Sequence, residues 1–130
     1  MIKVRFVTPE GLYKEVEATE INCHSTDGWR GILPNHMPIV LMLEISRLEI
    51  VNKGTKDEYA ISGGMLYFKD NEATFLVNSI ESKEEIDLER AEDAKKRAEE
   101  RINGKDSNID MKRAQIALAR AINRISVSSY

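Results

Sequence analysis

Residues 86–91 read Ile-Asp-Leu-Glu-Arg-Ala, and residues 109–114 nearly repeat them as Ile-Asp-Met-Lys-Arg-Ala. Each copy opens a stretch in which apolar residues return every three to four positions, the period of an amphipathic helix. Residues 2–80 differ, because short alternating runs are separated there by Gly, Pro, Asn and Asp. The chain is therefore predicted to consist of a β domain, residues 1–84, followed by a helical hairpin domain, residues 85–130.

Short alternating runs fill the first domain. Ile2, Val4 and Phe6 recur with a period of two, which places three apolar side chains on one face of a strand. Similar runs, bounded by turn-forming residues, predict further strands over residues 13–23, 39–43, 45–51, 58–62, 65–69 and 72–78. No helix-length segment lies between these runs, so an antiparallel sandwich or flattened barrel is favoured over a βαβ layout.

Residues 27–38 depart from this alternation, because they contain two glycines, two prolines and the only tryptophan. The turn-forming residues predict a shaped loop in which Ile32 and Leu33 close the end of the sandwich. Trp29 and Arg30 belong to the residue types most enriched at interface hot spots, so the loop is also a candidate partner-binding surface. The structural and the binding interpretations are compatible.

Each repeat carries the signature of a helix start. Asp87 and Asp110 stand at the N-cap positions, where a carboxylate accepts from a free backbone N–H group of the first turn. Ile86 and Ile109 precede them and are placed to pack against the alanine at the fourth position of each helix. The repeat is thus partly the ordinary chemistry of helix initiation.

The apolar stripe of each helix is narrow and rich in alanine. Asn103-Gly104 predicts the end of the first helix in a left-handed cap, and the polar residues 105–108 allow the chain to reverse. Alanine seams bury little apolar surface, at about 25 cal/mol per Å², so an antiparallel hairpin of marginal stability is expected. The predicted stripes are Leu88, Ala91, Ala94 or Ala98 and Ile102, then Met111, Ala114, Leu118, Ala121 or Ile122 and Ile125.

The arginines of the two helices are grouped by face. Spacings of seven and four residues place Arg90 with Arg97, and Arg113 with Arg120 and Arg124, on single helix faces. Acidic residues four positions away can pair with some charges of the first helix on a solvated surface, whereas residues 111–130 contain no Asp or Glu. The unpaired arginines of the second helix predict an anion-binding site.

Composition excludes several other functions. The net charge of −3 gives no general attraction to nucleic acid, and no apolar run approaches the roughly 20 residues that cross a bilayer. Cys23 is the only cysteine and His24 and His36 the only histidines, so neither a disulfide nor a familiar metal-ligand cluster is expected. No nucleophile and base, and no phosphate-binding glycine loop, appear in a catalytic arrangement, so an enzyme is not predicted.

Several motifs together resemble the epsilon subunit family of bacterial rotary ATP synthases, over the whole chain. Residues 28–38 look like the family's glycine-rich loop, which ends in an Ile-Leu-Pro-x-His-x-Pro pattern. Residues 61–64, Ile-Ser-Gly-Gly, look like its strand junction. Residues 90–102 and 117–124 look like its two terminal helices. Each motif is of moderate specificity, but their common order is strong evidence.

The resemblance implies an α+β fold: a ten-stranded antiparallel β sandwich followed by a C-terminal two-helix antiparallel hairpin. It implies a non-catalytic rotor subunit of a proton-translocating ATP synthase, held at the cytoplasmic face of the bacterial membrane through the complex. The sandwich would bind the gamma subunit and the c-ring. The residues expected to face the ring are Trp29, Arg30, Ile32, Pro34 and His36. Trp29 and Arg30 replace the Glu and aliphatic residue that many relatives carry there.

In the family the hairpin is regulatory. Folded on the sandwich it permits turnover, and extended along the gamma shaft it reaches the catalytic alpha/beta head and inhibits ATP hydrolysis. In the bacillus-like branch ATP stabilises the folded form through an Ile/Leu-Asp-x-x-Arg-Ala motif, which residues 86–91 satisfy. Residues 109–114 have similar spelling, so the choice of the first copy depends on the resemblance. By position, the nucleotide site would comprise Glu81, Ile86, Asp87, Arg90, Ala91, Arg97, Arg120 and Arg124.

The resemblance also assigns a role to each group. Glu81 or Asp87 would accept from the adenine amino group, Ile86 and Ala91 would bound the ring, and the arginines would meet the phosphates. ATP would act as a regulatory ligand, with no metal-ligand set visible in the sequence. The alternative is a ligand-free scaffold, in which the hairpin binds a partner protein and senses no nucleotide.

Overall fold

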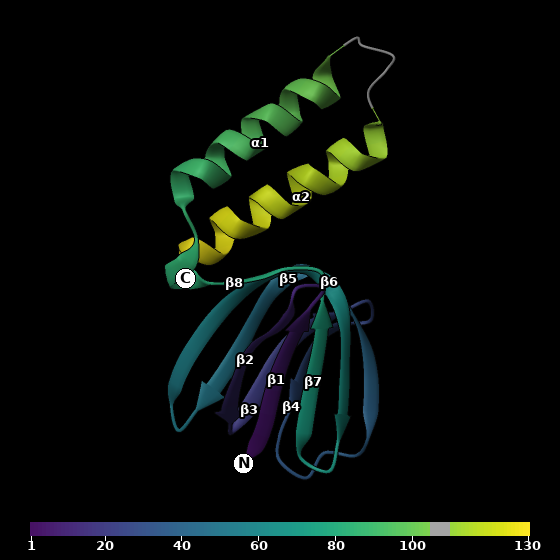
Figure 1. The fold of residues 1–130 in the computed structure, drawn as a ribbon, viewed down its shortest axis with the longest axis vertical. Coiled ribbons are helices and arrows are strands. Elements are labelled where there is room, and N and C mark those ends of the chain that lie inside the picture. The colour runs from purple at the N-terminus through teal and green to yellow at the C-terminus, as the bar shows by residue number, and fades with distance from the viewer. Residues whose placement is uncertain (105–109) are drawn as a thin grey trace.

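The computed structural model describes residues 1–104 and 110–130. It consists of a β sandwich with a helical hairpin seated on one end, opposite the N-terminus (Figure 1). The strands are β1 Ile2–Thr8, β2 Gly11–Ala18, β3 Glu20–Ser25, β4 Gly28–Ile32, β5 Ile39–Asn52, β6 Thr55–Lys69, β7 Glu72–Val77 and β8 Ile80–Ser82. A short 3-10 helix, η1 Lys83–Glu85, leads into helices α1 Leu88–Asn103 and α2 Met111–Ser128.

The strands form one continuous hydrogen-bonded path in the order β2-β1-β7-β6-β5-β3-β4, with β8 added on β6. The two longest strands, β5 and β6, pair from Ile39–Phe68 to Asn52–Thr55 and contribute to both layers of the sandwich. Their partners enclose a core in which Phe6 lies 5.2 Å from Tyr59 and 5.3 Å from Phe75 between ring centroids. The predicted α+β class and the sandwich-plus-hairpin architecture are confirmed.

The number of strands differs from the expected ten, because runs predicted as separate strands are continuous. Residues 39–43 and 45–51 both belong to β5, and residues 58–62 and 65–69 both belong to β6. Gly63 and Gly64, at φ +93° and +146°, bend β6 without ending it. The orientation also differs at one position, because β1 pairs with β7 in parallel.

Two further segments differ between the structure and the prediction from the sequence. Residues 13–23 divide into β2 and β3, and the segment expected to be a loop begins with strand β4. The expected alternation in β1 is confirmed, since Ile2, Val4 and Phe6 are fully buried. Ile32 is buried as predicted, whereas Leu33 is 58% exposed and does not close the sandwich.

Both predicted helix starts are confirmed by their caps. The side chain of Asp87 accepts from the backbone N–H of Arg90, and that of Asp110 accepts from Arg113, each at 3.1 Å. Ile109, the partner expected beside the second cap, lies outside the described residues. Helix α1 ends at Asn103, but the left-handed cap was wrong, because Gly104 is extended at φ −73° and ψ 157°.

The seam between the helices is narrower than the predicted stripes. Four alanines are buried along it, Ala91, Ala98, Ala114 and Ala121, whereas Leu88, Met111 and Ile122 are more than 40% exposed. Small side chains let two helix backbones approach closely, but they remove little apolar surface from water. Val127, at the last turn of α2, is fully buried and was not predicted. The hairpin therefore depends on its attachment to the sandwich.

Replacing Gly64 by Ala is expected to lower the free energy of unfolding by about 3 kcal/mol. A Cβ atom there would overlap the backbone carbonyl of Leu76, and φ is +146°. Urea unfolding followed by far-ultraviolet circular dichroism measures the loss.

Gly11→Ala is the matched control. Gly11 also has a positive φ, +114°, but a Cβ atom would meet nothing within 4 Å. Its cost should be limited to the backbone term, about 1 kcal/mol. Equal costs at both positions would contradict the close approach of β6 to β7.

Candidate functional site

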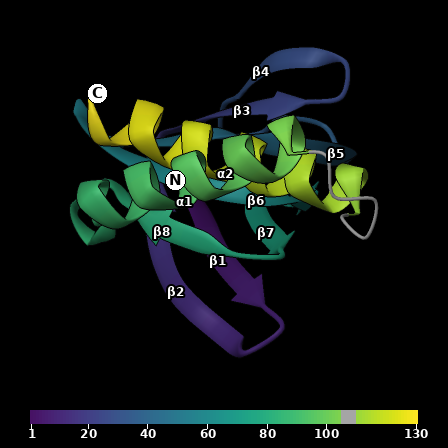
Figure 2. The ribbon, with the colours of Figure 1, turned by 90° about the horizontal axis from the view of Figure 1, so that it is seen from above.

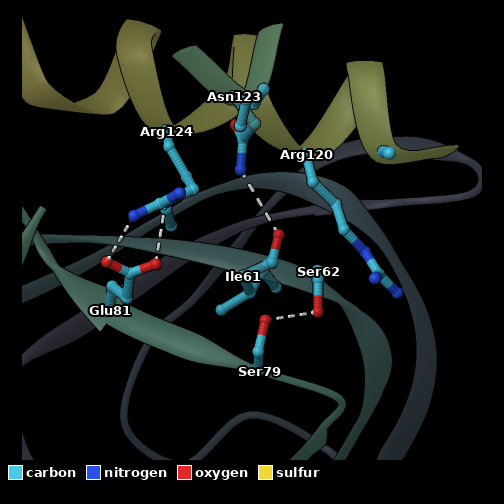
Figure 3. A pocket seen from close by; sticks show the side chains of 11 residues that line it. Ile61, Ser62, Ser79, Glu81, Arg120, Asn123 and Arg124 are labelled. Atoms are coloured by element: carbon cyan, nitrogen blue, oxygen red, sulfur yellow. Dashed lines mark hydrogen bonds and ion pairs between the residues drawn. The ribbon is translucent and has the colours of Figure 1, made fainter. Parts of the chain in front are cut away.

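A cavity of about 280 Å³ lies where the hairpin meets the bend of β6. Helix α2 lies between α1 and the sandwich, and the far ends of both helices project beyond it (Figures 1 and 2). The cavity has a small apolar part made by Ala60, Ile61, Ala94, Ala117 and Ala121. Its polar lining consists of Ser62, Ser79, Glu81, Arg120, Asn123 and Arg124 (Figure 3).

Arg124 and Glu81 form a two-point ion pair across the cavity. Nε of Arg124 lies 2.8 Å from Oε1 of Glu81, and an Nη2 N–H donates to Oε2 at 3.2 Å. The Nε–H is not aimed at the carboxylate, so only the second contact is a hydrogen bond. Arg124 comes from α2 and Glu81 from β8, with 23% and 33% of their side chains exposed. The pair ties the hairpin to the sandwich.

Asn123 attaches the same helix to the two long strands. Its side-chain amide donates to the carbonyl of Ser46 at 2.9 Å and to that of Ile61 at 3.3 Å. Ser46 and Ile61 face each other in the pairing of β5 with β6. Figure 3 shows the Asn123 side chain reaching from α2 to the Ile61 carbonyl. A hydrogen bond of this kind contributes about 1 kcal/mol and fixes the direction of the helix more strongly than an apolar contact does.

Arg120 supplies a cation that is not neutralised within the part of the chain that the structure describes. Its side chain runs from α2 toward the sandwich beside Ser62 (Figure 3). It makes no ion pair with any described acidic residue, in contrast to Arg124. Oγ of Ser62 lies 2.6 Å from Oγ of Ser79, so hydroxyl donors stand on the same wall. A guanidinium beside hydroxyl and amide groups suits an anionic ligand.

The structure brings three of the eight predicted nucleotide-site residues together. Glu81, Arg120 and Arg124 line the cavity. The other five lie on or just before α1, outside its lining: Ile86, Asp87, Arg90, Ala91 and Arg97.

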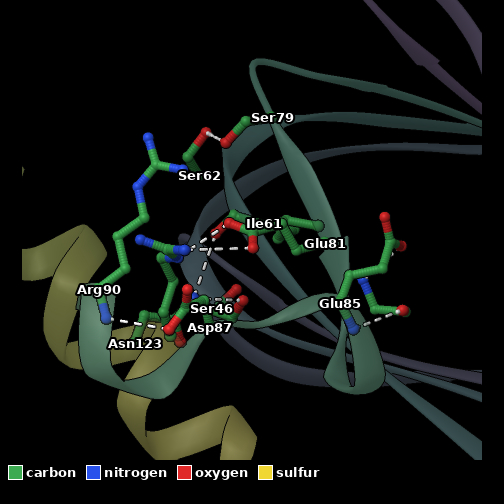
Figure 4. A network of polar contacts seen from close by, with 11 residues as sticks. Ser46, Ile61, Ser62, Ser79, Glu81, Glu85, Asp87, Arg90 and Asn123 are labelled. Atoms are coloured by element: carbon green, nitrogen blue, oxygen red, sulfur yellow. Dashed lines mark hydrogen bonds and ion pairs between the residues drawn. The ribbon is translucent and has the colours of Figure 1, made fainter. Parts of the chain in front are cut away.

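Those five residues have different surroundings. Ala91 is buried in the seam, and Asp87 is engaged as the helix cap. Ile86 is half-buried, whereas Arg90 and Arg97 are exposed. Figure 4 shows Arg90 extending from the first turn of α1 on the side of the network that carries Ser62. The first turn of α1 therefore borders the cavity without closing it.

Sequence reasoning missed three polar members of this site: Asn123, Ser62 and Ser79. The helical period gave no signal for Asn123, because a residue two positions from Ala121 points away from the apolar stripe of α2. Ser62 and Ser79 lie 17 residues apart and meet only through the pairing of β6 with its neighbours. Their contact therefore depends on a register that the sequence alone does not specify.

The linker between the two parts is also fixed by polar contacts. Ser82 and Glu85 form a capping box, with the Ser82 N–H donating to Glu85 Oε1 at 3.1 Å. The Tyr13 hydroxyl donates to the same carboxylate oxygen. Burial, with the Glu85 carboxylate beside it, raises the pKa of Tyr13 to about 12. The same hydrogen bond lowers the pKa of Glu85.

One outer face of the sandwich carries an apolar row that was not predicted. In register across five strands it contains Met42, Met65, Leu76, Val7 and Leu12. Leu12 and Met42 are more than half exposed, and Leu76 is 43% exposed. A contiguous exposed apolar surface of this kind marks an interaction site. The signal was the unbroken apolar run 39–43, in which both faces of the strand are apolar.

The predicted partner loop is divided by the fold. Trp29 is 44% exposed and lies tilted against His24, with ring centroids 4.2 Å apart, near the hairpin. Arg30 is exposed, but Ile32 has 1% exposure and is a core residue, so its side chain is not a contact surface. Pro34 and His36 are half-buried in the β4–β5 connection at the opposite end of the sandwich.

That connection is held in shape by an asparagine pair. The backbone N–H of Asn35 donates to Asn71 Oδ1 at 2.6 Å, and Nδ2 of Asn71 donates back to Asn35 Oδ1 at 3.0 Å. Asn35 itself has φ +69°, a conformation that asparagine tolerates. His36 lies edge-on to Phe68 with centroids 5.9 Å apart. The segment is therefore a fixed surface at the end remote from the hairpin.

These features define a binding subunit: a rigid sandwich with an exposed apolar face, and a helical hairpin attached over a polar cavity. Comparisons with known proteins make the class specific. Residues 1–83 match the family described as "ATP synthase, Delta/Epsilon chain, beta-sandwich domain". Residues 84–129 match "ATP synthase, Delta/Epsilon chain, long alpha-helix domain".

Individual relatives agree along nearly the whole chain. The ATP synthase epsilon chain of Bacillus cytotoxicus is 42% identical over 126 residues, covering 97% of this chain and 95% of that protein. The epsilon chain of Clostridium novyi is 43% identical over 126 residues, with 96% and 95% covered.

A chain in the cryo-EM structure of the Euglena gracilis mitochondrial ATP synthase, comprising OSCP, F1 and the c-ring, has the same fold. Its TM-score is 0.82 at 23% identity, and the likeness covers 99% of this chain and 81% of that one. The chain described here belongs to the epsilon-chain family of the F-type ATP synthases. It is a subunit of that machine and not its catalytic part. No described helix is long and apolar enough to span a membrane.

Replacing Tyr13 by Phe should remove one tyrosine titration with a midpoint near pH 12. The neutral phenol is the form that donates to Glu85, so its contribution to stability is complete below the ordinary pKa of 10.0 and is lost as the pH approaches 12. Ultraviolet difference titration of tyrosinate absorbance, wild type minus variant, measures the midpoint. A difference curve centred at pH 10 would contradict the contact with Glu85.

Proposed function

We propose that this subunit belongs to the rotor of a proton-translocating ATP synthase, and that its hairpin regulates ATP hydrolysis. The sandwich, residues 1–84, couples the gamma shaft and the c-ring to the catalytic head. The hairpin, residues 85–130, permits turnover when folded on the sandwich and inhibits hydrolysis when extended toward the alpha/beta head. The assembly holds the subunit at the cytoplasmic face of the membrane. The observation that carries the proposal is the polar cavity at the junction between hairpin and sandwich.

The junction is suited to opening. The contacts of the hairpin with the sandwich are made mainly by α2, through a few polar groups and a short apolar contact. The alanine seam within the hairpin survives if the two helices move together. Breaking one ion pair and two amide hydrogen bonds that water can replace costs a few kcal/mol. A ligand of comparable binding energy is enough to select the folded arrangement.

ATP is the ligand that we propose for the cavity. Arg120 makes no ion pair with the acidic residues that the structure describes and would meet a phosphate, while Arg124 would divide its donors between phosphate and Glu81. Arg90 and Arg97 on α1 would approach the phosphates from the open side. The cavity of about 280 Å³ is at the lower limit for a small-molecule site, so the base would extend toward the first turn of α1.

The first turn of α1 offers chemistry that suits adenine. Ile86 is half-buried beside the linker, and Ala91 presents a small surface in the seam. Asp87 caps the helix through Oδ1, which leaves its second carboxylate oxygen for an amino group. Charge-assisted hydrogen bonds to the phosphates would contribute roughly 1.5–3 kcal/mol each, enough for two of them to hold a marginal hairpin.

The partner surfaces are proposed from two separate places. The apolar row from Met42 to Leu12 is the surface that we assign to the gamma shaft, since it is a continuous exposed apolar face. The β4–β5 connection, with Pro34 and His36, is assigned to the c-ring, because it is a fixed loop at the end away from the hairpin. Trp29 lies near the hairpin, so this assignment does not include it in the surface that contacts the c-ring.

A ligand-free scaffold is the second candidate, and one observation favours it. Arg124 is already neutralised by Glu81, so one of the two cations lining the cavity needs no bound anion. In that case the hairpin would be held by protein contacts alone. Isothermal calorimetry of the isolated subunit with ATP distinguishes the two candidates, because the scaffold predicts no heat of binding.

Arg120→Ala is expected to weaken ATP binding by about ten- to a hundredfold, because it removes the cation that is free to meet a phosphate. Arg124→Ala should also weaken it, with an added effect of leaving Glu81 unpaired. The dissociation constants come from calorimetry with ATP, and with ADP as a weaker ligand. Protection of the hairpin from proteolysis by ATP should fall in parallel.

Arg5→Ala is the matched control for the loss of one arginine. Arg5 pairs with Glu15 on an exposed part of the sandwich, with about half of each side chain exposed. Its replacement should leave ATP affinity unchanged. Equal affinities for all three variants and the parent would exclude the phosphate role of the cavity.

Met42→Glu and Leu76→Glu should each abolish co-purification with the gamma subunit, because each puts a charge on the apolar row without disturbing the core. Leu88→Glu is the control, since Leu88 is 44% exposed on α1 and lies away from this face. Pull-down of tagged subunit and a melting curve of each variant measure the effect. Retention of gamma by folded Met42→Glu and Leu76→Glu variants would rule out this face.

A further inference from the structure

A second contact between the hairpin and the sandwich involves Trp29, Arg47 and Tyr130. Cζ of Arg47, on β5, lies 5.0 Å from the centroid of the Trp29 ring and 4.0 Å from that of the Tyr130 ring. Trp29 belongs to β4, and Tyr130 lies two residues beyond the end of α2. A guanidinium within about 6 Å of an aromatic face is attracted by the ring.

Arg47 is held in place by groups of the sandwich. Its Nη1 atom contacts Glu49 Oε2 at 2.9 Å and Glu58 Oε2 at 3.0 Å. All three side chains are less than 20% exposed. The guanidinium plane is therefore fixed before any ring from the hairpin approaches, which reduces the entropy lost on contact.

Trp29 is also in contact with His24, with ring centroids 4.2 Å apart. Burial, together with the neighbouring Arg47 charge, lowers the pKa of His24. The sandwich thus presents a preorganised binding surface, formed by Trp29 and Arg47, for an aromatic ring. Tyr130 reaches it through a final turn in which its backbone N–H donates to Val127.

We propose that Trp29 and Arg47 form a latch for the ring of Tyr130, which holds the C-terminal end of α2 on the sandwich without any ligand. Val127, fully buried three residues earlier, anchors the same turn. A cavity of about 270 Å³ beneath this turn is lined by Arg47, Tyr130 and Asn123 among others. The latch acts on the folded hairpin alone, because its two halves come from the sandwich and from the end of α2.

The latch and the polar cavity act on one helix. Asn123 lines both cavities and fixes α2 between them. Loss of the latch should therefore increase opening of the hairpin even in the absence of nucleotide. If the proposed ATP site is correct, the same loss should also reduce apparent ATP affinity by the fraction of hairpin that is no longer folded.

Tyr130→Ala should raise the open population of the hairpin by about two- to thirtyfold, the range of a cation–π contact. Amide hydrogen exchange of α2 in the full chain, measured by mass spectrometry without nucleotide, reports this population. Tyr130→Phe keeps the ring and should exchange like the parent. Trp29→Leu should raise exchange in α2, while exchange in β1 and β7 stays unchanged.

A double variant separates the latch from unrelated effects. Trp29→Leu combined with Tyr130→Ala should exchange little faster than Tyr130→Ala alone. Trp29 acts on the hairpin through the contact between Arg47 and the Tyr130 ring, and Tyr130→Ala already removes that contact. Unchanged exchange in Tyr130→Ala, or fully additive effects in the double variant, would overturn the proposal. Because no nucleotide is present, a failure to bind ATP would leave this result unaffected.

Discussion

The close approach of β6 to β7 at Gly64 is the constraint on which the rest of the structure depends. A side chain there would overlap the carbonyl of Leu76, and only a residue without one permits β6 to bend and continue. Because β5 follows β6 through the bend, both strands cross from one layer of the sandwich to the other. The crossing creates the end surface on which α2 lies and places Ser62 and the Ile61 carbonyl in the candidate site.

The contacts between the hairpin and the sandwich define the orientation of α2 closely but contribute only a small free energy of attachment. Directional contacts of Asn123 and Arg124 fix the C-terminal part of α2, and the buried side chain of Val127 anchors its last turn. The buried residues described in the hairpin are four alanines and Val127, so the attachment lacks the large hydrophobic term that holds the sandwich together. This combination gives one defined folded position that can be left at modest cost. Such a balance is a requirement for any element whose position is controlled by a ligand.

Local signals in the sequence predicted the local structure well. The caps at Asp87 and Asp110 and the alternation in β1 were correct, because each depends on residues within one turn or one strand. Gly63 and Gly64 were interpreted as a junction between two separate strands, since two glycines permit a reversal as readily as a bend. Only the neighbouring strand β7, whose Leu76 carbonyl lies against Gly64, decides between these outcomes, and it lies outside the local sequence.

The sequence predicted the charged residues of the candidate site but not its uncharged polar residues. The absence of acidic residues from α2 indicated free arginines, and the structure gives Arg120 no ion pair among the residues described. The pairing of Arg124 with Glu81 was missed, because the two residues are 43 positions apart and come together only when the hairpin folds back. Asn123 was missed for the same reason, as its acceptors are backbone carbonyls of β5 and β6.

Opening of the hairpin, as proposed, would change the balance of charge at both of its attachments. Arg124 would leave Glu81, and the end of α2 would leave Arg47, but Arg47 would keep its two carboxylates. The sandwich therefore loses no buried neutralisation when the hairpin departs, and the penalty falls on Glu81, which is one-third exposed and can be hydrated. The folded and open arrangements thus differ mainly in contacts that water can replace. A bound anion at Arg120 would shift that equilibrium toward the folded form. The groups that would donate to the anion come from both α2 and the sandwich, and they are brought together only when α2 lies on the sandwich.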